Sequence, residues 1–193
     1  MTGPSVAVVR AVDRRRVPWR NGAGVTEEVA SGPESRDGQP LWRISVADLG
    51  AEPSAFSAFD GLHRIFTVVG AHGVTLDWDT RSESVTPWHP HPFDGAHAPR
   101  CTPAGATSAL NVMVDASTAG ATVQRVDLGA GPLTSRPDEV TALFVRSGTV
   151  VAASHRVAAG DCLVVTHDEI ALRGNADGLV IRIRIPKSSN DLL

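Results

Sequence analysis

Two histidines separated by one residue, His89 and His91, are the most direct candidates for metal chemistry in the sequence. They lie in the segment TPWHPHPFDGAH, residues 86–97, which also supplies a carboxylate and a third histidine. On a strand, an H-x-H pair points both imidazoles to one face, where they could bind Fe, Mn, Ni or Zn. The three prolines of this segment favour a loop or extended surface segment instead, because proline cannot donate to a strand ladder. We therefore expect no metal or other cofactor and keep a His89/His91 site as an alternative.

A second candidate is a set of polar residues that recur on one side of apolar segments: Glu28, Arg43, Ser45, Arg64 and Asn111. A guanidinium suits carboxylates because its planar fork donates two parallel hydrogen bonds, and a neighbouring Glu or Asn would hold the fork in place. Two interpretations stay open. The residues form either the solvent-exposed outer face of antiparallel strands or the lining of a barrel whose lumen holds one small anion.

Other catalytic chemistries find little support in the sequence. Ser45 and Ser57 have no evident His and acid partners, and neither lies in a G-x-S-x-G elbow. Cys101 and Cys162 are far apart and lack a C-x-x-C arrangement, so neither a zinc knuckle nor a disulfide scaffold is indicated. No glycine-rich phosphate loop opens a helix.

The composition narrows the class of protein. A chain of 193 residues with 42% hydrophobic content can bury a substantial core. Its net charge of -3 gives no basic surface for nucleic acid or an anionic membrane. No signal peptide is evident, and no run approaches the roughly 20 apolar residues of a membrane helix. With only two cysteines, we expect a cytoplasmic protein with no nucleic-acid or membrane partner.

Short apolar segments separated by glycine and proline predict an all-β fold. The 18 glycines and 13 prolines recur about every ten residues, and no window shows a helical period of apolar positions. The predicted strands are residues 5–12, 24–30, 41–49, 63–70, 73–78, 107–115, 121–128, 139–145, 148–153, 160–166, 169–174 and 178–185.

A weak internal echo suggests two related β units. TVVGAHGVTLDW in the first half and LFVRSGTVVAAS in the second both read as strand, tight turn and strand. The later segment AAGDCLVV is similar to a hairpin common in cupin barrels.

Three ordered motifs resemble the HutD/Ves family. They are PWRNGAGVTEEVA, then LWRISVADLGAEPSAFSAFDGLHRIFTVVGAHGVTL, then PFDGAHAPRCTPAGATSALNVMVD. The resemblance covers nearly the whole chain and is strongest from Val17 to Asp115. In the first motif, Ala23 stands where the family has a glycine.

The resemblance implies a bicupin, two fused cupin-like (RmlC-like jelly roll) β-barrels in a single unit spanning residues 1–193. We expect residues 1–115 to form the first half, 116–187 the second half, and 188–193 a polar tail. The family's motif residues, carried to this sequence, are Trp19, Asn21, Gly22, Gly24, Thr26, Glu28, Trp42, Arg43, Ser45, Ser57, Phe59, Arg64, Asn111 and Met113. All except Trp42 are expected to bind ligand.

The first motif is then interpreted as one wall of a pocket, in which Trp19 supplies an apolar surface and Asn21 a directional polar contact. The alternative is that both residues only cap and pack a turn.

The family is associated with bacterial histidine utilisation and with environmental stress, and no firm enzymatic activity comes with it. We expect a metal-free protein, more a sensor or modulator than an enzyme, that binds a small carboxylate such as formylglutamate or urocanate. The alternatives are a metal-dependent isomerase or dioxygenase using His89 and His91, and an interaction module with a vestigial pocket. Sheet edges would permit a homodimer.

Overall fold

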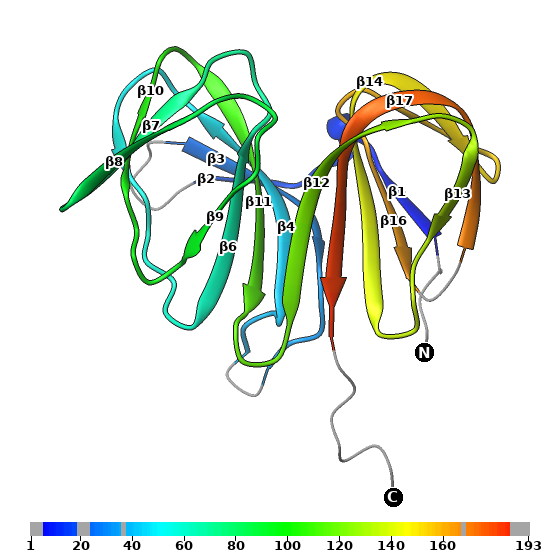
Figure 1. Cartoon of the computed structure of the whole chain (residues 1–193), viewed down its shortest axis with the longest axis horizontal. Coiled ribbons are helices and arrows are strands. Elements are labelled where there is room, and N and C mark those ends of the chain that lie inside the picture. Colours follow the sequence, from blue (N-terminus) through cyan, green and yellow to red (C-terminus); the bar gives the residue numbers. More distant parts are fainter. Residues whose placement is uncertain (1–5, 19–23, 36–37, 167–168, 186–193) are drawn as a thin grey trace, which may run out of the picture. The chain divides into compact units, whose positions relative to one another are not determined.

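The fold is all-β apart from one turn of 3-10 helix, as the all-β prediction requires (Figure 1). The computed structural model describes residues 6–18, 24–35, 38–166 and 169–185. Contacts divide the chain into two compact units. The first unit is Arg14–Ser117, and the second unit is Met1–Asp13 together with Thr118–Leu193.

The first unit contains two antiparallel sheets. The six-stranded sheet has the order β2-β3-β4-β11-β6-β9 and the four-stranded sheet the order β5-β10-β7-β8. The six strands of the larger sheet are β2 (Arg16–Pro18), β3 (Gly24–Ser31), β4 (Trp42–Leu49), β6 (Leu62–Val68), β9 (His91–Asp94) and β11 (Thr107–Asp115). The smaller sheet consists of β5 (Ser54–Ala55), β7 (Val74–Trp78), β8 (Arg81–Val85) and β10 (Arg100–Pro103).

The core of the first unit joins these two sheets. Phe66 and Ala109 of the larger sheet belong to the same buried cluster as Leu76 and Cys101 of the smaller one. Strand side chains alternate between faces, so residues in register with Phe66 and Ala109 also point toward the smaller sheet. We call this surface of the six-stranded sheet the inner face.

The second unit is built around one seven-stranded sheet with the order β1-β16-β14-β17-β12, to which β13 and β15 are attached. Its elements are β1 (Val6–Val9), η1 (Ala11–Asp13), β12 (Gly120–Leu128), β13 (Gly131–Thr134), β14 (Glu139–Ala152), β15 (His155–Ala158), β16 (Cys162–Thr166) and β17 (Glu169–Arg184). Its core cluster includes Leu143, Leu163, Val165 and Val180. None of the three sheets closes on itself within the described ranges.

The N-terminal strand belongs to the second unit. Val6 of β1 lies opposite Val165 of β16, although the sequence-based halves place residues 1–115 together. Asp161 fixes the segment that follows, since its Oδ1 accepts a hydrogen bond of 3.1 Å from the amide of Ala11. Its Oδ2 accepts a bond of the same length from the amide of Ala158.

The predicted strands are present in the structure, but two pairs of them merge and one segment predicted as a loop is a strand. Residues 139–145 and 148–153, predicted as separate strands, form the single strand β14, and residues 169–174 and 178–185 likewise merge into β17. The prediction of a loop or extended surface segment around His91 is wrong in part, because β9 pairs with β6. Pro92 is accommodated because β9 is an edge strand. No helix among the described residues is long and apolar enough to cross a membrane.

Candidate functional site

Three predicted residues meet in one row of the inner face. Met113 of β11 lies opposite Arg43 of β4 on one side and opposite Arg64 of β6 on the other. The adjacent row brings Ser45, Asn111 and Phe66 together in the same way. Because cross-strand partners share a face, the predicted residues on β4, β6 and β11 converge.

The wet-surface interpretation does not hold for β4. Ser45 is 2% exposed and Ala47 4% exposed, and both lie on the same face as Arg43. Ala47 is also part of the core cluster between the two sheets. These side chains therefore line the interior of the first unit.

Arg64 is the central group of this interior. It is only 6% exposed. Its Nε and Nη2 both donate to Oδ1 of Asn111, over 2.9 and 2.6 Å. An amide oxygen satisfies donors but supplies no negative charge. No carboxylate of the described residues forms an ion pair or hydrogen bond with Arg64.

Aromatic rings surround the Arg64 guanidinium. Its Cζ lies 4.3 Å from the ring centre of Phe56, 5.4 Å from that of Phe93 and 5.8 Å from that of Phe66. Rings attract a cation through their quadrupole, but this attraction is weak compared with the cost of burying an isolated charge. The site therefore holds a positive charge in an apolar environment.

The electrostatics of the site follow from this burial. Desolvation, and then the positive charge of Arg43, lower the pKa of Arg64 from its ordinary value to about 9. Burial raises the pKa of the Cys101 thiol to about 11, although the Arg64 charge acts in the opposite direction. Arg64 is still charged at neutral pH, but its charged form is less stable than that of an exposed arginine, and a bound anion would stabilise it.

Arg43 adds a second positive charge. Its Nη2 lies 3.7 Å from the Met113 sulfur, a weak acceptor. Arg43 is half-buried and has no carboxylate partner in the described part of the chain. Two guanidinium groups on one inner face, without a counter-ion from those residues, are suited to bind an anion.

The remaining predicted residues lie around this centre or apart from it. Thr26 is half-buried and Glu28 exposed on β3, in register with Ala47 and Ser45, and Gly24 lies opposite Leu49 at the end of that ladder. Ser57 and Phe59 lie in the segment between β5 and β6, where Ser57 is exposed. Trp19, Asn21 and Gly22 lie outside the described residues.

Sequence reasoning missed the three aromatic residues at Arg64. Phe59 was the phenylalanine predicted to bind ligand, and its amide donates a hydrogen bond of 2.8 Å to the carbonyl of Gly95 in a turn. Phe56, three residues earlier in the same motif, is the residue stacked on the guanidinium. The available signal was the Phe-Ser-x-Phe motif, which contains both rings but does not say which one faces Arg64.

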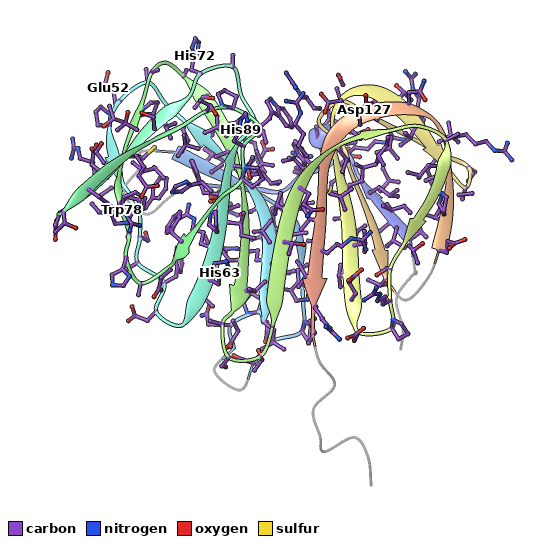
Figure 2. All side chains as sticks on the ribbon, in the orientation of Figure 1. Glu52, His63, His72, Trp78, His89 and Asp127 are labelled. Carbon is purple, nitrogen blue, oxygen red and sulfur yellow. The ribbon has the colours of Figure 1, made fainter. Side chains whose placement is uncertain are left out.

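The two histidines of the H-x-H pair have separate partners. Nδ1 of His89 lies 2.9 Å from both the Thr86 hydroxyl and the Pro87 carbonyl, and Nε2 of His91 lies 3.3 Å from a Glu83 oxygen. His91 lies against Trp78, which is far from His89 in the view of Figure 2. Among the residues that the structure describes, no three His, Cys, Asp or Glu gather as a metal site.

Two surface hollows of the first unit have linings, among the described residues, that do not include Arg64. One, of about 270 Å³, is lined by Gly61, Leu62, His63, Asp94, Ala96 and Ala116. Leu62 is the first residue of β6 and precedes Arg64 by two residues, so this hollow lies where that strand begins. The other, of about 470 Å³, is lined in part by Leu49 and Thr107, several rows away.

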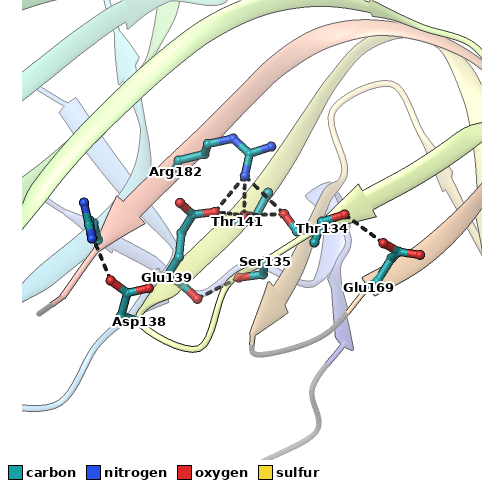
Figure 3. Close-up of polar contacts among 8 residues, drawn as sticks. Thr134, Ser135, Asp138, Glu139, Thr141, Glu169 and Arg182 are labelled. Carbon is teal, nitrogen blue, oxygen red and sulfur yellow. Dashed lines mark hydrogen bonds and ion pairs between the residues drawn. The ribbon is translucent and has the colours of Figure 1, made fainter. Parts of the chain in front are cut away.

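A second arginine cluster lies in the second unit (Figure 3). Nη1 of Arg182 donates to a Glu139 carboxylate oxygen over 2.6 Å, to the Thr141 hydroxyl over 3.3 Å and to the Thr134 carbonyl over 3.1 Å. Arg182 follows the core residue Val180 by two positions on β17, so it shares a face with the core of its unit. This arginine has its own carboxylate.

Comparison with known proteins identifies the family. The HutD family model matches residues 11–181. An uncharacterised 21.2 kDa protein in the hutC 3' region of Pseudomonas putida is 40% identical over 97 residues, 49% of this chain and 50% of the relative. The chain thus matches about half the length of this curated relative.

Solved structures agree with this assignment. HutD from Pseudomonas fluorescens SBW25 superimposes with a TM-score of 0.81 at 29% identity, covering 94% of this chain and 99% of the other. A cupin 2 conserved barrel domain protein from Leptotrichia buccalis gives a TM-score of 0.58 at 11% identity, covering 84% of this chain and 89% of its own, which shows the fold alone. The fold is therefore cupin-like, and the chain belongs to the HutD family.

Proposed function

We propose that this protein binds a small carboxylate inside its first unit and acts as a binding or regulatory protein. The observation that carries this proposal is Arg64, a buried guanidinium that is oriented by Asn111 and has no carboxylate partner in the described ranges. A carboxylate would accept bidentate hydrogen bonds and supply the missing negative charge. A neutral ligand would not.

The surroundings of Arg64 fit a compact anion with an apolar body. The rings of Phe56, Phe66 and Phe93 exclude water from the guanidinium, which strengthens an ion pair formed there. Phe56 lies outside regular structure and is half-buried, so its ring is the part of this wall that would move aside to admit the ligand. We propose that admission occurs from the hollow lined by Leu62.

The relatives support a carboxylate from histidine degradation as the first ligand to test. The relative from P. putida is a protein of the hutC 3' region, and the family resemblance links such proteins to histidine utilisation. We therefore propose histidine-pathway carboxylates, and binding in the cytoplasm, as the working assignment.

The test is thermal unfolding with a panel of carboxylates, followed by titration calorimetry. A ligand that binds only the native state stabilises it, by about 2.7 kcal/mol at a concentration of 100 Kd. We expect a rise in Tm for the wild type, none for Arg64→Met, and a rise equal to that of the wild type for Arg81→Met. Arg81 is the matched control because it is exposed and already paired with Glu83.

Two results would reject the proposal. One is the absence of any carboxylate that raises Tm in the wild type. The other is an unchanged response in Arg64→Met. If Arg64→Met does not fold, Arg64→Lys keeps the charge but loses the bidentate fork, and it should bind at least about tenfold more weakly than the wild type.

A further inference from the structure

Strand β12 is the longest sheet edge in the described part of the molecule. Its nine residues, Gly120–Leu128, pair with β17 in unbroken register. Within the described ranges no strand pairs with the other side of β12. An edge strand presents a row of N–H and C=O groups that can pair with another chain. β12 is therefore a candidate interaction surface, and it lies outside the proposed carboxylate site.

The other edge strands are less suited to pairing. β2, β9 and β13 contain Pro18, Pro92 and Pro132. β1, β5 and β15 are only two to four residues long. β8 has five residues and carries the ion pair between Arg81 and Glu83. Short length, proline and charge discourage edge pairing, whereas β12 is long, regular and free of proline.

The two faces of β12 differ in character. Val126 and Leu128 are partly buried and pack against the core of the second unit. Arg125 and Asp127 alternate with them, so they lie on the opposite face, and both are exposed. A strand laid along β12 would therefore extend an apolar layer on one face and meet two opposite charges on the other.

Asp127, labelled in Figure 2, has no counter-charge among the described residues. Its side chain forms no hydrogen bond or ion pair with them, and it lies directly opposite Asp177 of β17. Like charges that face each other across a ladder destabilise it. Arg125 uses Nε and Nη2 for Asp177, over 3.3 and 3.1 Å, so its Nη1 donors remain available. The exposed face of β12 thus offers one unmatched carboxylate and one guanidinium with spare donors.

A second copy of this chain matches both groups at once. When a two-fold axis perpendicular to a sheet pairs identical strands, opposite residues share a face only if the axis passes through a residue. With Val126 on the axis, Arg125 of each copy lies directly opposite Asp127 of the other. No other centre within β12 brings these two residues opposite each other, because 126 is the midpoint of their numbers.

We propose that the chain forms a two-fold symmetric dimer through antiparallel pairing of β12, with Val126 on the axis. Each Asp127 then gains a cation, and each row of free backbone groups gains a partner. On the other face, Leu128 of one copy lies opposite Gln124 of the other, so the apolar layer continues across the interface. A single pair of strands is a small contact, so we expect a reversible dimer in the micromolar range.

The experiment is analytical ultracentrifugation of the full chain from about 1 to about 500 µM. Arg125→Glu and Asp127→Lys each place like charges at both symmetric contacts, so each should raise the dimer dissociation constant at least about tenfold. In an equal mixture of the two variants, one protomer is negative and the other positive at both contacts. The mixture should therefore associate with an affinity within about threefold of the wild type.

Two controls keep the test decisive. Asp60→Lys, at an exposed position of the first unit, is a matched charge reversal and should leave the dissociation constant unchanged. Thermal unfolding checks that each variant is folded. If one is not, hydrogen exchange of the wild type tests the same edge. Amides of β12 that point away from β17 should exchange at least about tenfold more slowly at dimer concentrations than after dilution.

Four results would overturn the inference. They are a wild type that stays monomeric over the whole range, a dissociation constant unchanged in both charge variants, a mixture that does not associate, and exchange of β12 that does not depend on concentration. Carboxylate binding at Arg64 does not involve this interface. The proposed function therefore stands or falls by its own test.

Discussion

The two units each place an arginine on the core-facing side of a sheet, but they provide it with different partners. Arg182 in the second unit has the Glu139 carboxylate at 2.6 Å (Figure 3). Arg64 in the first unit has the amide of Asn111 at a similar distance. The first arrangement is neutral and complete, whereas the second is geometrically ordered but carries an unmatched charge. An ordered donor without a counter-ion is the pattern expected of a binding site, and a neutral pair is the pattern expected of a structural contact.

The largest effect is expected from Asn111→Asp, which gives Arg64 a carboxylate partner of the kind that Arg182 already has. The new carboxylate would supply the negative charge that the ligand otherwise brings to Arg64, so carboxylate affinity should fall by about a hundredfold while Tm without ligand rises. Titration calorimetry and thermal unfolding would measure the two effects. Asn175→Asp, at an exposed position of the second unit, is the control and should change neither. Retained affinity in Asn111→Asp would contradict the site.

A second effect depends on the charge state of Arg64. Its pKa of about 9 means that carboxylate affinity should be constant at neutral pH and fall by up to tenfold per pH unit above 9, because binding then requires proton uptake. Calorimetry between pH 7 and 10.5 would show the decline. In Arg43→Met the decline should begin at higher pH, because the Arg43 charge is one cause of the lowered pKa. An identical onset in both proteins would count against this coupling.

Removing the carboxylate from the second unit tests the structural side of the comparison. Glu139→Gln should lower the free energy of unfolding by about 1–2 kcal/mol, less than for a fully buried pair because the Arg182 side chain is 42% exposed. Urea unfolding would measure the loss. Glu169→Gln, which disturbs an exposed contact with the Thr134 hydroxyl, should cost less than half as much. If Glu139→Gln and Glu169→Gln lowered the free energy of unfolding equally, the ion pair between Glu139 and Arg182 would not stabilise the fold more than an exposed contact does.

The smallest effect is expected at the exposed arginine pair of the second unit. The hydrogen bond from Arg125 lowers the pKa of Asp177 most, and Arg146 lowers it further. Together the two arginines hold this pKa below its usual 3.8. A lowered acid pKa adds stability above the unfolded pKa, and this stability is lost as pH falls through the folded value. Asp177→Asn should therefore cost at most about 1 kcal/mol at pH 7 and progressively less as pH is lowered below 3.8. Asp60→Asn, at an exposed position of the first unit, is the control, and a pH-independent difference would refute the assignment.

Local alternation was sufficient to predict most strands but not their ends. Thr107–Asp115 matches its predicted range at both ends. The predicted turns inside β14 and β17 were wrong because their glycines serve a different purpose. A side chain at Gly148 would collide with the carbonyl of Asn175, and one at Gly178 with the carbonyl of Phe144. These glycines allow close approach of two long strands, and a single sequence does not distinguish that need from a turn.

The polar residues of the site could be predicted from the sequence, but the aromatic residues around Arg64 could not. Arg43, Arg64 and Asn111 are near one another because strands β4, β11 and β6 are neighbours with fixed register. Strand alternation assigned each residue to a face, and the family motif linked the three strands. The rings of Phe56 and Phe93 come from segments 37 residues apart, and no local pattern encodes that both lie against Arg64.

The pairing of β1 with β16 has a consequence for biosynthesis. The first unit is complete in the growing chain once Ser117 has been made, and it can fold while the ribosome is still working. The strand Val6–Val9 must wait for its partner Cys162–Thr166, and the bond between Ala11 and Asp161 spans 150 residues. At about 5–20 residues per second, this apolar strand stays unpaired for many seconds. The nascent chain therefore carries an unpaired apolar strand on the N-terminal side of an already folded unit, and chaperone dependence should concentrate at Val6–Val9.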